Sequence, residues 1–166
     1  PHAWLDAVNA KLWVNYINDM LSKQDPENAS IYSSNAAKAT ASLDTLIRST
    51  RTKIDALSKP QFIVFHDAYQ YFEMDFDFPA SGAISISDAS DPSPARIVEI
   101  QSRIAEQGID CVLAEPQFNP GLVATVLDGT QAQTGILDPL GSDLEPGPAL
   151  YPQLIRNLST ALAGCM

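Results

Sequence analysis

The sequence predicts an α/β protein in which a long amino-terminal helical strut precedes a four-stranded parallel sheet with helices on both faces. Two observations predict this fold. Up to Pro60, apolar side chains recur at helical spacing, and from Gln61 onward short apolar runs alternate with helical segments. Uninterrupted apolar runs separated by helices are typical of parallel strands that are covered on both faces. We therefore expect two parts, connecting helices over residues 1–58 and an α/β lobe over residues 59–166.

Two helices are predicted in the strut. Asp6 is a suitable N-cap for the first, in which apolar residues recur every four positions from Val8 to Met20. Asp25, followed by a proline, caps a second helix that ends at Pro60. At 1.5 Å per residue this second helix is roughly 45 Å long. Because a small domain does not need such a length, we expect it to act as a strut.

The remaining elements alternate along the chain. The expected strands are residues 62–65, 83–86, 109–114 and 135–137. The expected helices are residues 67–74, a segment opened by Ser93 and ended by Gly108, a segment opened by Asn119, and a last helix that Gly164 ends. Ser93 and Asn119 each precede a proline, which is the usual order of an N-cap and a first helical residue.

The composition excludes several classes of protein. Aliphatic, aromatic and sulfur-containing residues make up 45% of the 166 residues, which excludes wholesale disorder. The formal charge of −10 argues against nucleic acid as a partner, because phosphate binding requires basic side chains. The chain starts with Pro1 and contains no signal peptide, so we interpret it as a mature piece or a fragment.

Polar groups follow three of the four predicted strands. His66 comes directly after the first apolar run, Glu115 after the third and Asp138 after the fourth. In an open parallel sheet, the carboxyl ends of the strands meet at one edge, and ligands bind there. A single carboxylate at such a position is usually a helix N-cap, but three polar groups in register indicate a site.

The only other histidine, His2, lies just before the first predicted helix. Both histidines have an aromatic residue nearby, Trp4 in one case and Tyr69 in the other. Imidazole and carboxylate ligands suit zinc or another divalent first-row metal, whereas calcium requires more oxygen ligands. The residue types therefore favour a metal site.

Several alternatives remain open at this stage. A metal-dependent hydrolase could use the same strand-end residues with Glu115 as the base, and an interaction module could use them only to cap helices. The sequence contains neither a glycine-rich phosphate loop nor a Gly-x-Ser-x-Gly motif. Cys111 and Cys165, separated by 54 positions, are either two buried thiols or one disulfide.

Four segments resemble the metal-specific solute-binding proteins of bacterial ABC importers, and in particular their periplasmic zinc-uptake (ZnuA) group. These segments are PHAWLD at residues 1–6, FHDAY at 65–69, AEPQF at 114–118 and LDPLG at 137–141. Their order is the order found in the family. The resemblance extends over the whole chain, but this chain corresponds to only part of a family member.

The resemblance implies two α/β lobes joined by one long helix, with metal held in the cleft between them. This chain then corresponds to the long connecting helix and the carboxyl-terminal lobe. The resemblance implies that His2, His66 and Asp138 are metal ligands and that Glu115 supports a ligand without touching the metal. It also implies a disulfide between the two cysteines.

The resemblance sets the expected role and partners as well. We expect capture of Zn²⁺, with Mn²⁺ as the alternative, and delivery to the membrane permease of an ABC importer in the periplasm, without enzymatic chemistry. Manganese-specific relatives are similar but carry Glu at the position of His66. We expect the missing amino-terminal lobe to supply another ligand, so the site in this chain alone should be incomplete or empty. Surfaces normally covered by that lobe also allow the chain to dimerise.

Overall fold

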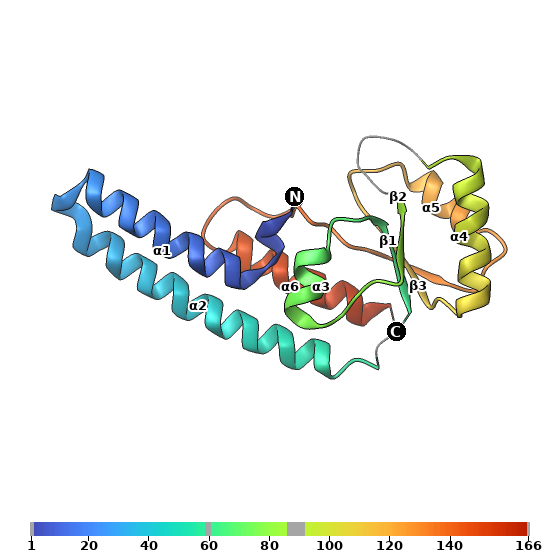
Figure 1. Cartoon of the computed structure of the whole chain (residues 1–166), viewed down its shortest axis with the longest axis horizontal. Helices are drawn as coiled ribbons and strands as arrows, with labels where there is room; N and C mark the ends of the chain where they lie inside the picture. Colours follow the sequence, from blue (N-terminus) through green and yellow to red (C-terminus); the bar gives the residue numbers. More distant parts are fainter. Residues whose placement is uncertain (1, 59–60, 86–91, 166) are drawn as a thin grey trace.

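The first third of the chain forms a helical hairpin. The computed structural model describes residues 2–58, 61–85 and 92–165, and it begins with a 3-10 turn (Ala3–Leu5) and helix α1 (Ala7–Gln24). A second 3-10 turn (Pro26–Asn28) leads into helix α2 (Ala29–Asp55), which runs back along α1 (Figure 1). At 1.5 Å per residue α2 is about 40 Å long, slightly shorter than predicted. The predicted stop, Pro60, lies outside the described residues.

The two predicted N-caps of the hairpin behave differently. Asp6 caps α1 as expected, because its carboxylate accepts hydrogen bonds from the backbone N–H groups of Val8 (2.7 Å) and Asn9 (3.2 Å). Asp25 takes the predicted N-cap position before Pro26, but it caps a 3-10 turn and not the long helix, and its side chain does not cap that turn. Its carboxylate accepts hydrogen bonds from the side chains of Asn28 (2.8 Å) and Tyr32 (2.6 Å), and it makes no side-chain hydrogen bond to the backbone of the following turn.

A strand forms at each of the four predicted places, and the four make one parallel sheet, although the fourth begins two residues before its predicted start and ends before Leu137. They are β1 (Phe62–His66), β2 (Gly82–Ser85), β3 (Cys111–Ala114) and β4 (Gln133–Ile136), in the spatial order β2-β1-β3-β4. Val64 is in register with Ala83 on one side and with Leu113 on the other. The α/β fold with a parallel sheet is therefore confirmed. Ile86, which was expected to end the second strand, lies outside the described residues.

Helices cover both faces of this sheet. The elements are α3 (Gln70–Phe76) and α6 (Leu150–Gly164) on one face, and α4 (Pro94–Gln107) and α5 (Pro120–Leu127) on the other (Figure 1). Because successive strand side chains point to opposite faces, β1 contributes to two separate cores. Phe62 and Val64 pack with α3 and α6, while Ile63 and Phe65 pack with α4 and α5.

One apolar face of α1 is exposed. The side chains of the apolar stripe from Val8 to Met20 face solvent, and Tyr16 is 67% exposed. Instead, Ala10 and Val14 on another side of the helix pack towards the core. Helical periodicity identifies residues that share a face, but it does not identify what covers that face. The exposed large apolar residues of α1 are Val8, Leu12, Trp13, Tyr16, Ile17, Met20 and Leu21.

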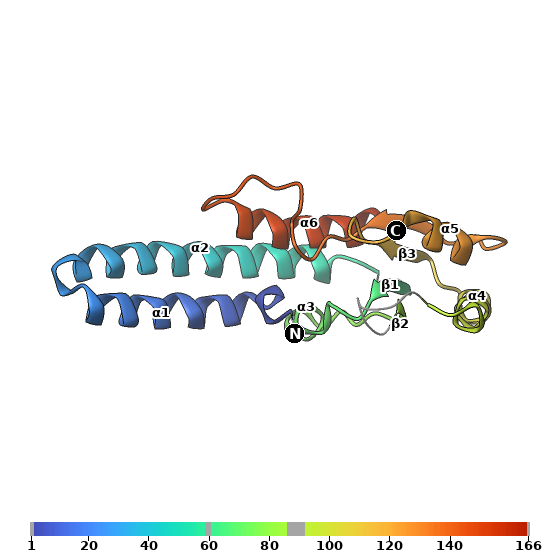
Figure 2. The same cartoon turned by 90° about the horizontal axis from the view of Figure 1, so that it is seen from above.

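Two connections hold the hairpin and the end of the chain against the sheet. Helix α6 lies alongside α2, and the hairpin extends away from the sheet (Figure 2). Cys111 at the start of β3 and Cys165 after α6 form the expected disulfide, with a Cα–Cα distance of 5.7 Å. Within the described residues, none of the helices combines the length and the apolar character needed to cross a membrane.

Candidate functional site

The candidate residues lie at the carboxyl ends of three adjacent strands. His66 is the last residue of β1, Glu115 directly follows β3, and Asp138 comes two residues after β4. Strand β3 lies between β1 and β4, and neighbouring strands are about 4.8 Å apart. The backbones that carry His66 and Asp138 are therefore separated by about 10 Å, with Glu115 between them.

His66 and Glu115 form a buried pair. His66 is 5% exposed and Glu115 is 4% exposed. The imidazole Nδ1 lies 2.7 Å from Oε1 of Glu115, and the same oxygen accepts a hydrogen bond from the backbone N–H of His66 (3.3 Å). One carboxylate oxygen therefore holds both the ring and the backbone of the histidine.

The other ring nitrogen of His66 has no partner. Nε2 is buried and makes no hydrogen bond in the described part of the chain. The ring lies between aromatic neighbours, with its centroid 5.2 Å from that of His2 and 5.3 Å from that of Phe118. A buried polar atom without a hydrogen bond costs about 1–3 kcal/mol, so this nitrogen requires an explanation.

His2 reaches this position through an unusual backbone conformation. Its φ of 51° is in the left-handed region, directly before the first 3-10 turn, where its carbonyl accepts a hydrogen bond from the N–H of Leu5 (3.1 Å). The imidazole also packs edge-on against Trp4, with a centroid distance of 5.1 Å. The turn at the start of the chain thus brings the two histidines together, although they are remote in sequence.

The carboxylate of Asp138 is held by hydrogen bonds from its own loop and from Gln117. Its carboxylate accepts hydrogen bonds from the side chain of Gln117 (2.7 Å), the N–H of Leu140 (2.9 Å), and both the N–H (2.6 Å) and the hydroxyl (2.7 Å) of Ser142. Gly141 allows this tight loop because its φ is +70°. Burial by itself would raise the pKa of Asp138, but the hydrogen bonds from Ser142, Gln117 and Leu140 outweigh burial and lower it.

Two aromatic side chains tie this loop to the histidines. The indole N–H of Trp4 donates to the carbonyl of Pro139 (2.9 Å), and the hydroxyl of Tyr69 donates to the carbonyl of Leu137 (2.7 Å). Burial, followed by the negative charges of Glu115 and Asp138, raises the pKa of Tyr69. Tyr69 therefore lies within the electrostatic influence of both carboxylates.

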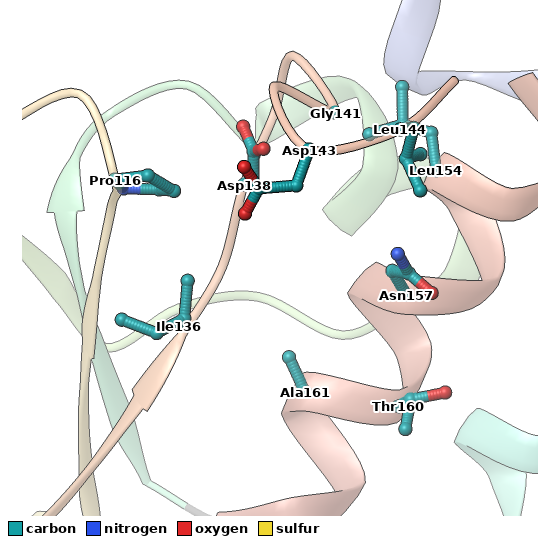
Figure 3. A pocket seen from close by; sticks show the side chains of 10 residues that line it. All are labelled: Pro116, Ile136, Asp138, Gly141, Asp143, Leu144, Leu154, Asn157, Thr160 and Ala161. Carbon is teal, nitrogen blue, oxygen red and sulfur yellow. The ribbon is translucent and has the colours of Figure 1, made fainter. Parts of the chain in front are cut away.

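A pocket of about 340 Å³ opens beside Asp138. Figure 3 shows the pocket between the strand that carries Ile136 and helix α6, which contributes Asn157 and Ala161. Asp138 and Asp143 line it from the connecting loop, whereas His2 and His66 are not among its lining residues. The pocket therefore includes the proposed carboxylate ligand but neither histidine.

The structure brings together only part of the predicted ligand set. The two histidine rings are adjacent and Glu115 contacts one of them. Among the described residues, no group of three or more His, Cys, Asp or Glu side chains is arranged to hold a metal ion. Sequence reasoning gave no role to Gln117 and Ser142, which bind Asp138. The only feature of the sequence that pointed to Gln117 was its place in the AEPQF segment, residues 114–118.

Comparisons with known proteins identify the family of the chain. The sequence model of the family described as "Zinc-uptake complex component A periplasmic" matches residues 1–165. The chain is 48% identical over 165 residues to the "High-affinity zinc uptake system protein ZnuA" of Brucella abortus (strain 2308), covering 99% of this chain and 49% of that protein. It is 40% identical over 167 residues to the protein of the same description from Paracoccus denitrificans (strain Pd 1222), covering 100% of this chain and 51% of that protein.

Solved structures of similar proteins share the fold. The laminin-binding adhesin Lmb of Streptococcus agalactiae superimposes with a TM-score of 0.86 at 25% identity, covering 99% of this chain and 62% of that chain. This chain spans about half the length of the curated relatives it matches. The family match over nearly every residue shows that the chain belongs to the zinc-uptake complex component A (ZnuA) family.

Proposed function

We propose that this chain is the carboxyl-terminal portion of a periplasmic protein that captures Zn²⁺ and delivers it to the membrane permease of an ABC importer. Family membership and the names of the relatives, which describe zinc uptake, support this proposal. These names describe transport and no chemical reaction, so they give no support to the alternative of a metal-dependent hydrolase.

The observation that carries the proposal is the unpartnered Nε2 of His66. This nitrogen is buried beside the ring of His2, with 5.2 Å between the two centroids. The unprotonated nitrogen of a neutral imidazole has a lone pair available for a metal ion, and no hydrogen bond occupies Nε2 in the described part of the chain. Two imidazoles favour zinc over manganese, because manganese prefers carboxylate and other oxygen ligands.

Asp138 is proposed as the third ligand, and it must change partners to bind. Its carboxylate is engaged by four hydrogen bonds within the 138–142 loop and to Gln117. Zinc binding therefore requires at least one carboxylate oxygen to exchange a hydrogen bond for the metal. In this proposal a fourth ligand from another lobe, or water, completes a tetrahedral site. Alone, this chain should bind zinc weakly or leave the site empty.

We propose that residues 1–58 are an inter-lobe strut and that residues 59–166 are the carboxyl-terminal lobe. The exposed apolar face of α1 supports this division, because a contiguous apolar surface on a folded protein is generally covered by a partner. In this proposal the amino-terminal lobe of the longer protein packs on that face. It also supplies a further metal ligand.

Substitution of His66 tests the proposal. In the longer protein that includes an amino-terminal lobe, His66→Ala should weaken zinc binding by at least 100-fold, because it removes one ligand of the proposed site. Isothermal titration calorimetry in a metal-free buffer measures the affinity. In this chain alone, zinc binding should already be weak before the substitution.

The neighbouring Asp67 provides a matched control. Its side chain is exposed and accepts a hydrogen bond from Gln70 (2.7 Å), so Asp67→Ala should leave the zinc affinity unchanged. Equal affinities of the wild type and His66→Ala would refute the assignment of His66. Turnover of an ester or phosphate substrate that a chelator abolishes would instead favour the hydrolase.

A further inference from the structure

We infer that Glu115 is a positioning residue, which holds the proton of His66 on Nδ1 and thereby leaves Nε2 as the metal-binding nitrogen. This inference rests on the proposed function, because it explains how one proposed ligand is prepared for zinc. It assigns to Glu115 a role that does not require contact with the metal.

The first step concerns the direction of the hydrogen bond between Glu115 and His66. Oε1 of Glu115 lies 2.7 Å from Nδ1, and it also accepts the hydrogen bond of the His66 backbone N–H. A backbone N–H can only donate, so Oε1 acts as an acceptor. A carboxylate oxygen has no proton of its own to donate. The contact of 2.7 Å between Nδ1 and Oε1 is therefore a hydrogen bond when Nδ1 carries the proton.

The second step concerns the remaining nitrogen. A neutral imidazole carries one proton, so a proton on Nδ1 leaves a lone pair on Nε2. Nε2 is buried without a hydrogen bond in the described part of the chain. An N–H group at this place would be a buried donor without an acceptor, at a cost of about 1–3 kcal/mol. The arrangement therefore favours the tautomer that can accept a metal ion.

The third step concerns rigidity. Glu115 directly follows β3, which pairs with β1, the strand that His66 ends. Both side chains are almost fully buried. The ring of Phe118 packs edge-on against that of His66, with 5.3 Å between the two ring centroids. Because the carboxylate also binds the backbone of His66, it restricts the rotation of the imidazole. Hydrogen bonds of this kind to metal-binding histidines typically contribute 10–100-fold to metal affinity.

Nitrogen NMR of the metal-free chain tests the tautomer directly. The chain has two histidines, so His2→Asn leaves His66 as the only imidazole in the spectrum. We expect ¹⁵N shifts that identify Nδ1 as protonated and Nε2 as unprotonated. In Glu115→Gln, whose amide can donate as well as accept, the two tautomers should become mixed. An Nε2–H tautomer in the metal-free chain with Glu115 intact would overturn the inference.

Zinc titration tests the consequence for binding. In the longer protein that includes an amino-terminal lobe, and with His2 present, Glu115→Gln should lower the zinc affinity by about tenfold or more, and Glu115→Asp, which keeps the acceptor but shortens the side chain, should restore part of it. Glu99→Gln is the matched control, because Glu99 lies on α4, where its side chain is 60% exposed and paired with Arg96. Amide spectra verify that each variant is folded.

The outcomes separate the inference from the proposed function. Unchanged zinc affinity in a folded Glu115→Gln variant would overturn the positioning role, even if the tautomer changed. No zinc binding by the longer protein that contains this chain would refute the proposed function. In that case the metal-free spectra would still decide which nitrogen of His66 carries the proton.

Discussion

Asp6 and Asp25 both precede a helix, but they bind different groups. Asp6 accepts hydrogen bonds from the backbone of α1, whereas Asp25 accepts them from the side chains of Tyr32 and Asn28. The hydrogen bond from Tyr32 and then that from Asn28 lower the pKa of Asp25. The same contact raises the pKa of Tyr32. At the level of the residue, the hydrogen-bond donors nearest to a carboxylate therefore decide whether it caps a helix or binds other side chains.

The Asp25–Tyr32 contact predicts a pH dependence of stability. A carboxyl group whose pKa is lower in the folded than in the unfolded state stabilises the fold above pH 4, and this contribution is lost as the pH falls through the folded-state value. Tyr32→Phe should therefore raise the pKa of Asp25 towards its ordinary value and reduce this contribution, while the hydrogen bond from Asn28 remains. Carboxyl ¹³C NMR titration measures the pKa. Tyr16→Phe, on the exposed face of α1, should leave it unchanged.

At the level of elements, a few cross-connections join parts that are distant in sequence. The disulfide links the start of β3 to the end of α6, and the indole of Trp4 binds the carbonyl of Pro139, 135 positions away. The hydroxyl of Tyr151 on α6 donates to the carbonyl of Trp4 (2.8 Å). These contacts attach the segment that carries His2 to the loop that carries Asp138.

Loss of the disulfide should destabilise the fold. The cross-link closes a loop across 54 positions, for which the chain-entropy model gives about 4 kcal/mol of stabilisation. We expect the double variant Cys111→Ser/Cys165→Ser to lose about 2–4 kcal/mol in urea unfolding. Reductant should destabilise the wild type and leave the double variant unchanged. Equal unfolding midpoints of the wild type and the double variant would contradict this expectation.

At the level of the whole molecule, charge and apolar surface are unevenly distributed. Residues 1–58 contain six basic and six acidic residues, whereas residues 59–166 contain four basic and fourteen acidic residues. Residues 1–58 are therefore neutral overall and include the exposed apolar face of α1, while the net charge of −10 belongs to residues 59–166. Repulsion between two copies is consequently weakest at residues 1–58.

This distribution predicts self-association of the chain when nothing else covers α1. Light scattering after size exclusion should detect dimers that increase with concentration, because two apolar faces can bury each other. Leu12→Glu, which places a charge on that face, should shift the chain to monomers. Met74→Glu, at an 83% exposed position on α3, should not. A chain that stays monomeric at all concentrations would contradict the prediction.

The fold was largely predictable because its signals are local. Apolar runs such as 62–65 marked the strands, and Ser93 and Asn119 mark helix starts, where their side chains accept the N–H groups of Arg96 (3.2 Å) and Gly121 (2.9 Å). These patterns depend on neighbours within a few positions. The carboxyl-edge positions of His66, Glu115 and Asp138 also followed from the strand pattern alone.

The sequence by itself determined which elements form and which polar residues end the strands, because backbone preferences and periodicity act over short distances. Only the tertiary structure decided that α1 exposes its apolar stripe, that Glu115 holds His66, and that Asp138 is bound by Gln117 and Ser142. The partner of a side chain depends on which distant segments the fold brings within about 3 Å, and no local pattern encodes that distance.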